Sequence, residues 1–307
     1  MNPSHSFILL QTFFPAGFVM NRKRFCINLR FSQKPWFYPF ISVIIATLIC
    51  LVTPVTTRAI DAGQLLPFIL QGVQVIQLSN MSPRQEVDIG KQINQQLLTS
   101  QVKLNRNSAL NRYIQQIGQR LVANSDRPDL PYTFQVVEDD TINAFATLGG
   151  FVYVNTGLLK TADNEAELAS VMAHEIGHIG GKHLVKQMRQ KALASGLASA
   201  AGLDRNQAVA IGVDLALNRP RSRGDEYDAD TRGLRTLTNS GYAPSGMVSF
   251  MEKLMKKGSS VPTFLSTHPA TGDRIKALQS AINNQPKSGG AGLDNSNYQA
   301  NIKALLR

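Results

Sequence analysis

The sequence predicts an α+β domain that is mostly helical and carries one small antiparallel sheet. Helix start signals recur along the chain, and the first is Ser82-Pro83-Arg84-Gln85, a capping serine followed by a first-turn proline and a capping-box glutamine. Strand signals occupy a single stretch, where residues 132–138 alternate in polarity and Gly149-Gly150 separates two short apolar runs. Helices on both sides of this stretch therefore have to cover the sheet.

The expected elements follow in a simple order. Helices are expected on both sides of a break at Pro128–Pro131, and Asp163 is expected to cap the helix that carries most of the histidines. Glycines 177, 180 and 181 within that helix indicate close packing or a bend. The other expected elements are helices at about 82–98, 107–123, 206–217, 224–240, 245–257 and 270–283, a strand at 132–138, and a hairpin of 142–148 with 151–155.

Length and charge narrow the classes of function. The chain has 307 residues, of which 43% are hydrophobic, enough for a sizeable core. Its formal net charge is +11, but six of the 32 basic residues and no acidic residue precede residue 60. The remainder carries 26 basic and 21 acidic residues, about +5, without a long basic run. This distribution argues against a nucleic-acid partner.

The first 59 residues are expected to be a signal peptide or targeting segment. Phe40–Val52 is an apolar run of the length of a signal-peptide core, basic residues precede it, and Thr57-Arg58-Ala59 offers a cleavage site. A start at Met20 would give a cleaner signal, so residues 1–19 are interpreted as an over-extended start. The prediction is an exported, periplasmic or extracytoplasmic protein. An uncleaved signal that anchors it to the membrane is the alternative.

The remaining chain is expected to divide into three parts. Residues 60–80 form an apolar segment that either docks on the main domain or lies at a membrane surface. Residues 81–285 form the main domain, and residues 286–307 form a flexible linker with a short C-terminal helix. Both cysteines of the chain lie in the targeting segment, so only histidine and carboxylate remain to hold a metal in the main domain.

The chemistry is expected to centre on an H-E-x-x-H helix, residues 171–179. His174 and His178 stand one turn apart and can share one metal ion. Glu175 falls within the apolar stripe of the same helix. A carboxylate that points inward beside two histidines is costly unless a cation or a proton-transfer role explains it. The pattern therefore predicts a zinc site with Glu175 as a general base.

A zinc site needs a third protein ligand, and the best candidate lies about fifty residues further on. Glu226 and Asp230, in the stretch Arg223–Asp230, share one helix face, so one can ligate while the other orients a histidine. An acidic helix face in solvent is the competing interpretation. The presence of H-E-x-x-H in the same chain makes it the less favoured one.

At this point the sequence resembles a known family of zinc metallopeptidases, which includes CAAX prenyl proteases, HtpX-type heat-shock proteases and BepA-like periplasmic proteases. The resemblance covers about 81–283, and we expect the compact, exported branch, without multiple membrane spans or a helical-repeat domain. The matching motifs are His174–His178, Glu226-x-x-x-Asp230, Asn143-Ala-Phe145 with Gly149-Gly150 and Asn155-Thr-Gly157, Ser82–Gly90, and Ser266-Thr-His-Pro269 with Arg274.

The resemblance implies a zincin-like fold and one zinc ion per chain. His174, His178 and Glu226 would be the zinc ligands, with a water in the fourth position. Glu175 would take a proton from that water and pass it to the leaving amine. Asp230 would brace one imidazole.

Three other residues have open roles. His268 is expected either to donate to the oxyanion of the tetrahedral intermediate or to bind zinc as a fourth ligand and hold the enzyme latent, and a plain loop histidine is the third interpretation. His183 lies five positions after His178, which turns it roughly 140° away if the helix is continuous, so a structural role is expected. Arg274 either supports the site or caps a helix.

Substrate is expected along residues 142–148. An edge strand beside a zinc cleft can pair with an extended peptide through Asn143, Ala144 and Phe145, which favours unfolded polypeptide. A hairpin strand covered by the chain's own loop is the alternative.

The expected function is a zinc endopeptidase for unfolded or misassembled envelope proteins, with peripheral membrane or outer-membrane assembly partners. A latent protease acting mainly as a chaperone-like holdase is the runner-up. A purely structural zinc protein comes third, because it would not need Glu175.

Overall fold

The computed structural model describes residues 78–196, 203–218, 221–256, 262–269, 272–284 and 289–306. All of them belong to one unit of the chain, Leu65–Arg307. The expected targeting segment, 1–59, and nearly all of the apolar segment 60–80 lie outside the described residues. Among the described helices, none is long and apolar enough to span a membrane.

The sheet consists of three short strands, β1 (Thr133–Val137), β2 (Ala144–Ala146) and β3 (Phe151–Asn155), in the order β1-β3-β2. β2 and β3 pair antiparallel, as the predicted hairpin requires. β1 pairs parallel to β3, so the sheet is mixed, whereas the sequence predicted an antiparallel one. After β1 the chain first forms the edge strand β2 and only then returns as β3, which takes the central position between them. The local alternation of polar and apolar residues does not reveal this strand order.

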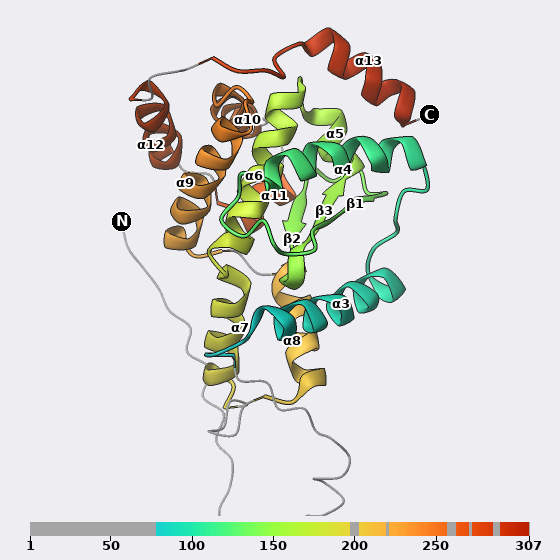
Figure 1. The fold of residues 1–307 in the computed structure, drawn as a ribbon, viewed down its shortest axis with the longest axis vertical. Helices are drawn as coiled ribbons and strands as arrows, with labels where there is room; N and C mark the ends of the chain where they lie inside the picture. Colours follow the sequence, from blue (N-terminus) through green and yellow to red (C-terminus); the bar gives the residue numbers. More distant parts are fainter. Residues whose placement is uncertain are drawn as a thin grey trace, which may run out of the picture. The chain divides into compact units, whose positions relative to one another are not determined.

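Both faces of the sheet are buried, and each face belongs to a different hydrophobic cluster. Val136, Val152 and Val154 face one cluster, whereas Phe145 and Tyr153 face the other. Because successive side chains of a strand point to opposite faces, the sheet separates two groups of helices (Figure 1). The predicted class, a mostly helical α+β domain with a small sheet, is confirmed.

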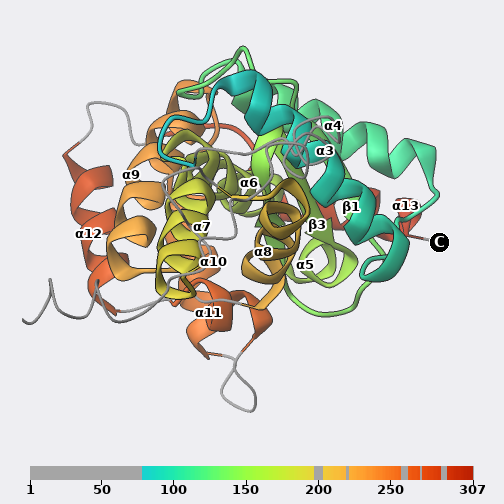
Figure 2. The same cartoon turned by 90° about the horizontal axis from the view of Figure 1, so that it is seen from below.

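The helices divide between the two faces (Figures 1 and 2). One group, which packs around the second cluster, is α3 (Pro83–Ser100), α7 (His183–Ala194) and α8 (Arg205–Asn218). The other group is α4 (Ser108–Val122), α5 (Thr156–Thr161), α6 (Glu165–Gly180), α9 (Arg223–Asn239), α10 (Ser245–Lys256), α12 (Gly272–Asn283) and α13 (Asn295–Leu305). Two short helices remain, the 3-10 turn η1 (Leu148–Gly150) and α11 (Thr263–Thr267).

Helix α6 is the centre of the domain, and residues 166–179 within it are all buried. It lies directly against α9, because glycines remove side chains from the contact. A Cβ on Gly177 would lie 2.6 Å from the Ala229 carbonyl oxygen, and one on Gly233 would lie 3.0 Å from the His174 Cα. The interpretation of Gly177 as a close-packing residue is confirmed. The helix cap is Asn164, whose side chain accepts from the Glu167 N–H, and the predicted cap Asp163 lies one residue before it.

The C-terminal stretch contacts the domain from residue 289 onward. The Ala166 N–H donates to the Gly292 carbonyl, and the Ala243 N–H donates to the Ala291 carbonyl. In α13, the Tyr298 hydroxyl donates to the Leu159 carbonyl. The expected short C-terminal helix is therefore present, while residues 286–288 of the expected linker lie outside the described residues. The domain boundaries themselves stay predictions.

A buried ion pair ties α3 to the end of α6. The Arg127 guanidinium donates to both carboxylate oxygens of Glu86, at 2.9 and 2.7 Å, and also to the Ile179 carbonyl at 3.2 Å. The Glu86 side chain is only 2% exposed. Ile179 directly follows the H-E-x-x-H motif, so this pair fixes the end of the helix that carries the motif.

We expect Glu86→Gln to lower the free energy of unfolding by about 2 kcal/mol, because it leaves the partly buried guanidinium of Arg127 without its counter-charge. Urea unfolding with linear extrapolation measures the change. Asp140→Asn is the matched control, since it removes an exposed ion pair with Lys160 and should leave the unfolding midpoint almost unchanged. Equal midpoints for the two variants would contradict a stabilising role of the buried pair.

Candidate active site

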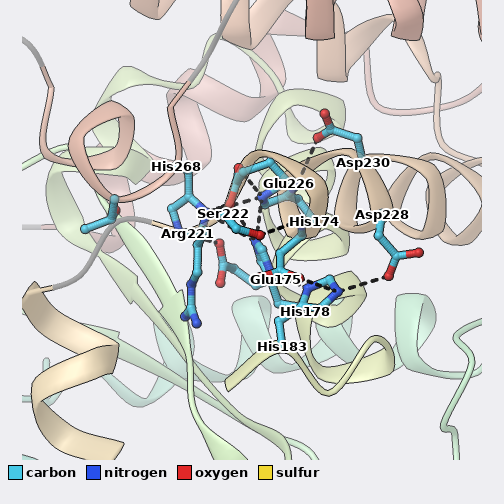
Figure 3. Close-up of polar contacts among 12 residues, drawn as sticks. His174, Glu175, His178, His183, Arg221, Ser222, Glu226, Asp228, Asp230 and His268 are labelled. Atoms are coloured by element: carbon cyan, nitrogen blue, oxygen red, sulfur yellow. Dashed lines mark hydrogen bonds and ion pairs between the residues drawn. The ribbon is translucent and has the colours of Figure 1, made fainter. Parts of the chain in front are cut away.

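Side chains from three segments converge at the centre of the domain (Figure 3). His174, Glu175 and His178 come from α6, Glu226 comes from α9, and His268 follows α11. Each of these five side chains is at most 3% exposed. His174, His178, Glu226 and His268 each offer one ligand atom, and these atoms lie within 4.8 Å of one another.

The separations between these four ligand groups fit a tetrahedral metal site. Zinc bonds of about 2.0–2.1 Å, arranged tetrahedrally, place neighbouring ligand atoms about 3.3 Å apart. Five of the six separations join one set of four atoms, with Oε1 of Glu226, and lie at 3.0–3.3 Å, whereas the sixth joins His174 to the other carboxylate oxygen, Oε2. They are 3.0 Å (His174 Nε2 to His178 Nε2), 3.3 Å (His174 Nε2 to His268 Nδ1), 3.3 Å (His178 Nε2 to His268 Nδ1), 3.1 Å (His268 Nδ1 to Glu226 Oε1), 3.3 Å (His178 Nε2 to Glu226 Oε1) and 3.5 Å (His174 Nε2 to Glu226 Oε2).

Hydrogen bonds alone do not account for this cluster. The Nδ1 of His174 lies 3.0 Å from Asp230 Oδ1, a carboxylate that only accepts, so Nδ1 carries a proton and Nε2 is the nitrogen that faces the centre. Three nitrogens and a carboxylate oxygen thus face one another at ligand spacing, and either a shared proton or a cation has to lie between them. A cation satisfies all of them at once, and nitrogen with carboxylate is a donor set that suits zinc.

Asp230 and Arg274 support His174 from behind. Arg274 donates to both oxygens of Asp230 at 2.7 Å, and its Nη1 lies 2.7 Å from Glu226 Oε2. Burial alone would raise the pKa of Asp230, but these bonds and His174 lower it. Burial alone would lower the pKa of His174, yet Asp230 and Glu226 raise it to about 9. Of the two roles open to Arg274, the observed contacts are those of a residue that supports the site.

His183 contacts His178, which the sequence did not predict. The expectation that it faces away assumed a continuous helix, but α6 ends at Gly180 and α7 begins at His183. Lys182, between them, adopts a left-handed conformation with φ 52°, which interrupts the helix. The His183 Nδ1 therefore lies 2.8 Å from the His178 Nδ1. Glycines 180 and 181 were the signal of this bend.

Glu175 is fully buried, and neither of its carboxylate oxygens accepts a hydrogen bond from the described residues. The imidazole of His268, the residue that follows α11, lies beside this carboxylate, with 3.4 Å between its Nε2 and Oε1 of Glu175. Burial lowers the pKa of Arg221, and Glu175 is the largest of the charges that oppose this shift. An unsatisfied carboxylate in a buried position is available for a proton or a water molecule.

The His268 segment is fastened over this site. The ring of Phe264 stacks on the ring of His268, with 4.7 Å between their centroids. The backbone N–H of Phe264 donates to the Ile142 carbonyl at 2.9 Å. The Arg221 N–H donates to the Thr267 carbonyl at 2.9 Å. The two nitrogens of His268 thus face the ligand cluster and Glu175, respectively.

The expected substrate strand, β2, forms one edge of the sheet. The Asn155 N–H donates to the Asn143 carbonyl, so the backbone groups of Ala144 point away from β3, following the antiparallel alternation. The side chain of Phe145 stacks on Tyr153, with 4.5 Å between ring centroids. Ala144 offers backbone groups at this edge, whereas the Phe145 side chain belongs to the core.

The comparison with known families decides the classification. The profile of peptidase family M48 matches residues 108–282, which is more than half of the chain and includes His174, His178, Glu226 and His268. This chain belongs to peptidase family M48. The family assignment agrees with the resemblance that the sequence motifs indicated.

Several named proteases are similar to this chain. The putative beta-barrel assembly-enhancing protease of Vibrio cholerae is 34% identical over 227 residues, 68% of this chain and 46% of that protein. The beta-barrel assembly-enhancing protease of Escherichia coli is 34% identical over 222 residues, 67% and 45%, respectively. The mitochondrial metalloendopeptidase OMA1 of Schizosaccharomyces pombe is 30% identical over 174 residues, 54% and 51%. The chain thus spans about half the length of these relatives.

We expect Gly177→Ala to lower the free energy of unfolding by about 2 kcal/mol and to weaken metal binding, because the added methyl group forces α6 away from α9. Gly224→Ala is the control, since a Cβ there has nothing within 4 Å and alanine favours the helix. Urea unfolding and a zinc-binding titration measure both effects. Unchanged zinc affinity in Gly177→Ala would show that the site does not depend on the closeness of the two helices.

Proposed function

We propose that this chain is a zinc-dependent endopeptidase, with His174, His178 and Glu226 as the protein ligands of one zinc ion. The observation that carries the proposal is the tetrahedral spacing of buried nitrogen and carboxylate donors beside an unsatisfied Glu175. When bound, zinc polarises a substrate carbonyl and makes water more acidic. Glu175 takes a proton from the attacking water and returns it to the amine nitrogen of the leaving peptide. Asp230 holds the proton on Nδ1 of His174 and so keeps its Nε2 lone pair directed inward.

We propose that His268 keeps the site latent in the arrangement seen here. A donor to the oxyanion needs a free N–H that faces the substrate carbonyl. Instead, the His268 Nδ1 lies at ligand spacing from Glu226, and its Nε2 lies beside Glu175. These contacts favour the role of a fourth ligand over that of an oxyanion donor. Substrate then enters only after the segment around α11 has moved.

We propose that the substrates are unfolded or misassembled proteins of the cell envelope. The similar proteins named for beta-barrel assembly support envelope substrates and outer-membrane assembly partners. The signal-like residues 1–59 support an exported, periplasmic location, with an uncleaved membrane anchor as the alternative. Pairing of an extended substrate along β2, at residues 143–145, would read backbone groups more than side chains and so give low sequence specificity.

A second candidate function, a chaperone-like holdase with rare cleavage, is favoured by the closed site. In that function, the chain binds unfolded polypeptide while His268 blocks chemistry. The two candidate functions differ in whether a catalytically inactive variant is still expected to bind unfolded polypeptide.

We expect Glu175→Gln to lower the rate of casein cleavage at least about 100-fold, because the variant lacks the general base. Its zinc content and circular dichroism should match those of the wild type, since the amide keeps the shape of the carboxylate and does not contact the ligand atoms directly. Suppression of client aggregation at wild-type level by this variant would assign the holdase activity to the chain. Undiminished cleavage would overturn the role of Glu175.

We expect His268→Ala to raise the cleavage rate above that of the wild type, because it opens the fourth ligand position. Phe264→Ala, which removes the ring stacked on His268, should raise the rate in the same direction. A fall in rate in His268→Ala would instead make His268 an oxyanion donor. If the wild type holds zinc and neither it nor His268→Ala cleaves, the holdase becomes the favoured function.

A further inference from the structure

The two histidines of the H-E-x-x-H motif have different neighbours on their outer sides. The Nδ1 of His174 faces a carboxylate, Asp230, as is common for histidines that bind metals. The Nδ1 of His178 faces another imidazole, that of His183, at 2.8 Å. On its far side, the His183 Nε2 lies 3.0 Å from Asp228 Oδ2. His178, His183 and Asp228 therefore form a chain that leads from the ligand cluster to the surface (Figure 3).

We propose that His183, held by Asp228, is a positioning residue that fixes the tautomer and the ring orientation of His178 for metal binding. The inference rests on the proposed function, because it assigns a role toward the same metal. The proposed role adds His183 and Asp228, which lie outside the H-E-x-x-H motif, to the residues that support the site.

The direction of the hydrogen bonds follows from the only member that cannot donate. The Asp228 carboxylate accepts, so His183 carries its proton on Nε2 and leaves Nδ1 as an acceptor. His178 then donates from its own Nδ1 to His183, and its Nε2 keeps the lone pair that faces the cluster.

The backbone around His183 is shaped to allow this contact. A Cβ on Gly181 would lie 2.3 Å from His183 Nε2 and 2.7 Å from Asp228 Oδ2. Only glycine leaves room there for the bond between the two side chains. Lys182 supplies the left-handed turn that brings the His183 ring back over His178. The break between α6 and α7 and the hydrogen-bond chain thus both depend on Gly181, Lys182 and His183.

Asp228 is held at its outer end. Arg232, one turn further along α9, donates from Nε to Asp228 Oδ2 at 2.6 Å, and it also pairs with Asp126. Asp225 is the other carboxylate near His183, but it lies 3.9 Å from Nε2 and is paired with Lys186. Asp228 is therefore the partner that orients His183, although its side chain is 42% exposed.

A purely structural role of His183, as a buried ring at the start of α7, gives different expectations for its variants. In that case His183→Phe, which fills the same volume, would bind zinc as well as the wild type. In the positioning role, His183→Phe loses the acceptor for His178, and zinc affinity falls about 10- to 100-fold. His183→Gln restores part of the affinity, because its amide oxygen can accept from the His178 Nδ1–H while its amide donates to Asp228.

The experiment measures the zinc dissociation constant of the full-length protein by competition with a chromophoric chelator at fixed pH. The variants are His183→Phe, His183→Gln and Asp228→Ala, and the control is Asp126→Asn, which disturbs the same ion-pair network without touching His183. We expect a loss for His183→Phe, a smaller loss for His183→Gln and for Asp228→Ala, and a change of less than about twofold for the control. Thermal unfolding of the metal-free variants separates loss of metal from loss of fold.

Nitrogen-15 NMR of the histidine rings gives a second readout, independent of zinc affinity. We expect the His183 signals of the Nε2–H tautomer in the metal-free and the zinc-loaded protein. A wild type that binds zinc, together with a folded His183→Phe of equal affinity, overturns the positioning role and leaves the proposed function standing. A wild type without zinc affinity overturns the proposed function, and the tautomer of His183 then still decides whether the hydrogen-bond chain exists.

Discussion

The candidate site depends on the closeness of two helices. His174 and His178 belong to α6, and Glu226 and Asp230 belong to α9, so a carboxylate meets the imidazoles only if the two backbones nearly touch. Gly177 and Gly233 make this possible, because each faces a backbone atom of the other helix with no side chain between them. The short distance between the helices is therefore as necessary for the proposed metal site as its candidate ligands are.

This closeness concentrates charge inside the domain. Glu175, Glu226 and Asp230 are carboxylates buried in the same region, where an ion is costly without compensation. Arg274 offsets part of that charge through bonds to Asp230 and Glu226. The inward-facing nitrogens of the histidines lie beside these carboxylates, where a divalent cation would offset the remaining negative charge. A positive charge at this position would therefore both stabilise the buried carboxylates and serve the proposed chemistry.

The sequence predicted most of the elements, because helix caps, glycines and polarity patterns are local signals. It also brought His174, His178, Glu226 and His268 together as candidates, and the fold places them in one cluster. It missed the parallel pairing of β1, which depends on which strand fills the centre of the sheet. It also missed the contact of His183 with His178, because one left-handed residue, Lys182, interrupts the helix between them. The first error concerns long-range strand order and the second the local conformation of the backbone, and neither concerns the chemistry of the residues.

The position of Arg274 has a consequence for how the site opens. Its guanidinium reaches Asp230, Glu226 and the carbonyl of Pro269, the residue directly after His268. Movement of the segment carrying His268, as proposed above, would break this bond to Pro269 together with the bonds from Phe264 to Ile142 and from Arg221 to Thr267. The bonds from Arg274 to the two carboxylates join α12 to α9 and would stay in place. Glu226 would therefore keep a positive neighbour in the open form, whereas Glu175 would lose the imidazole beside it.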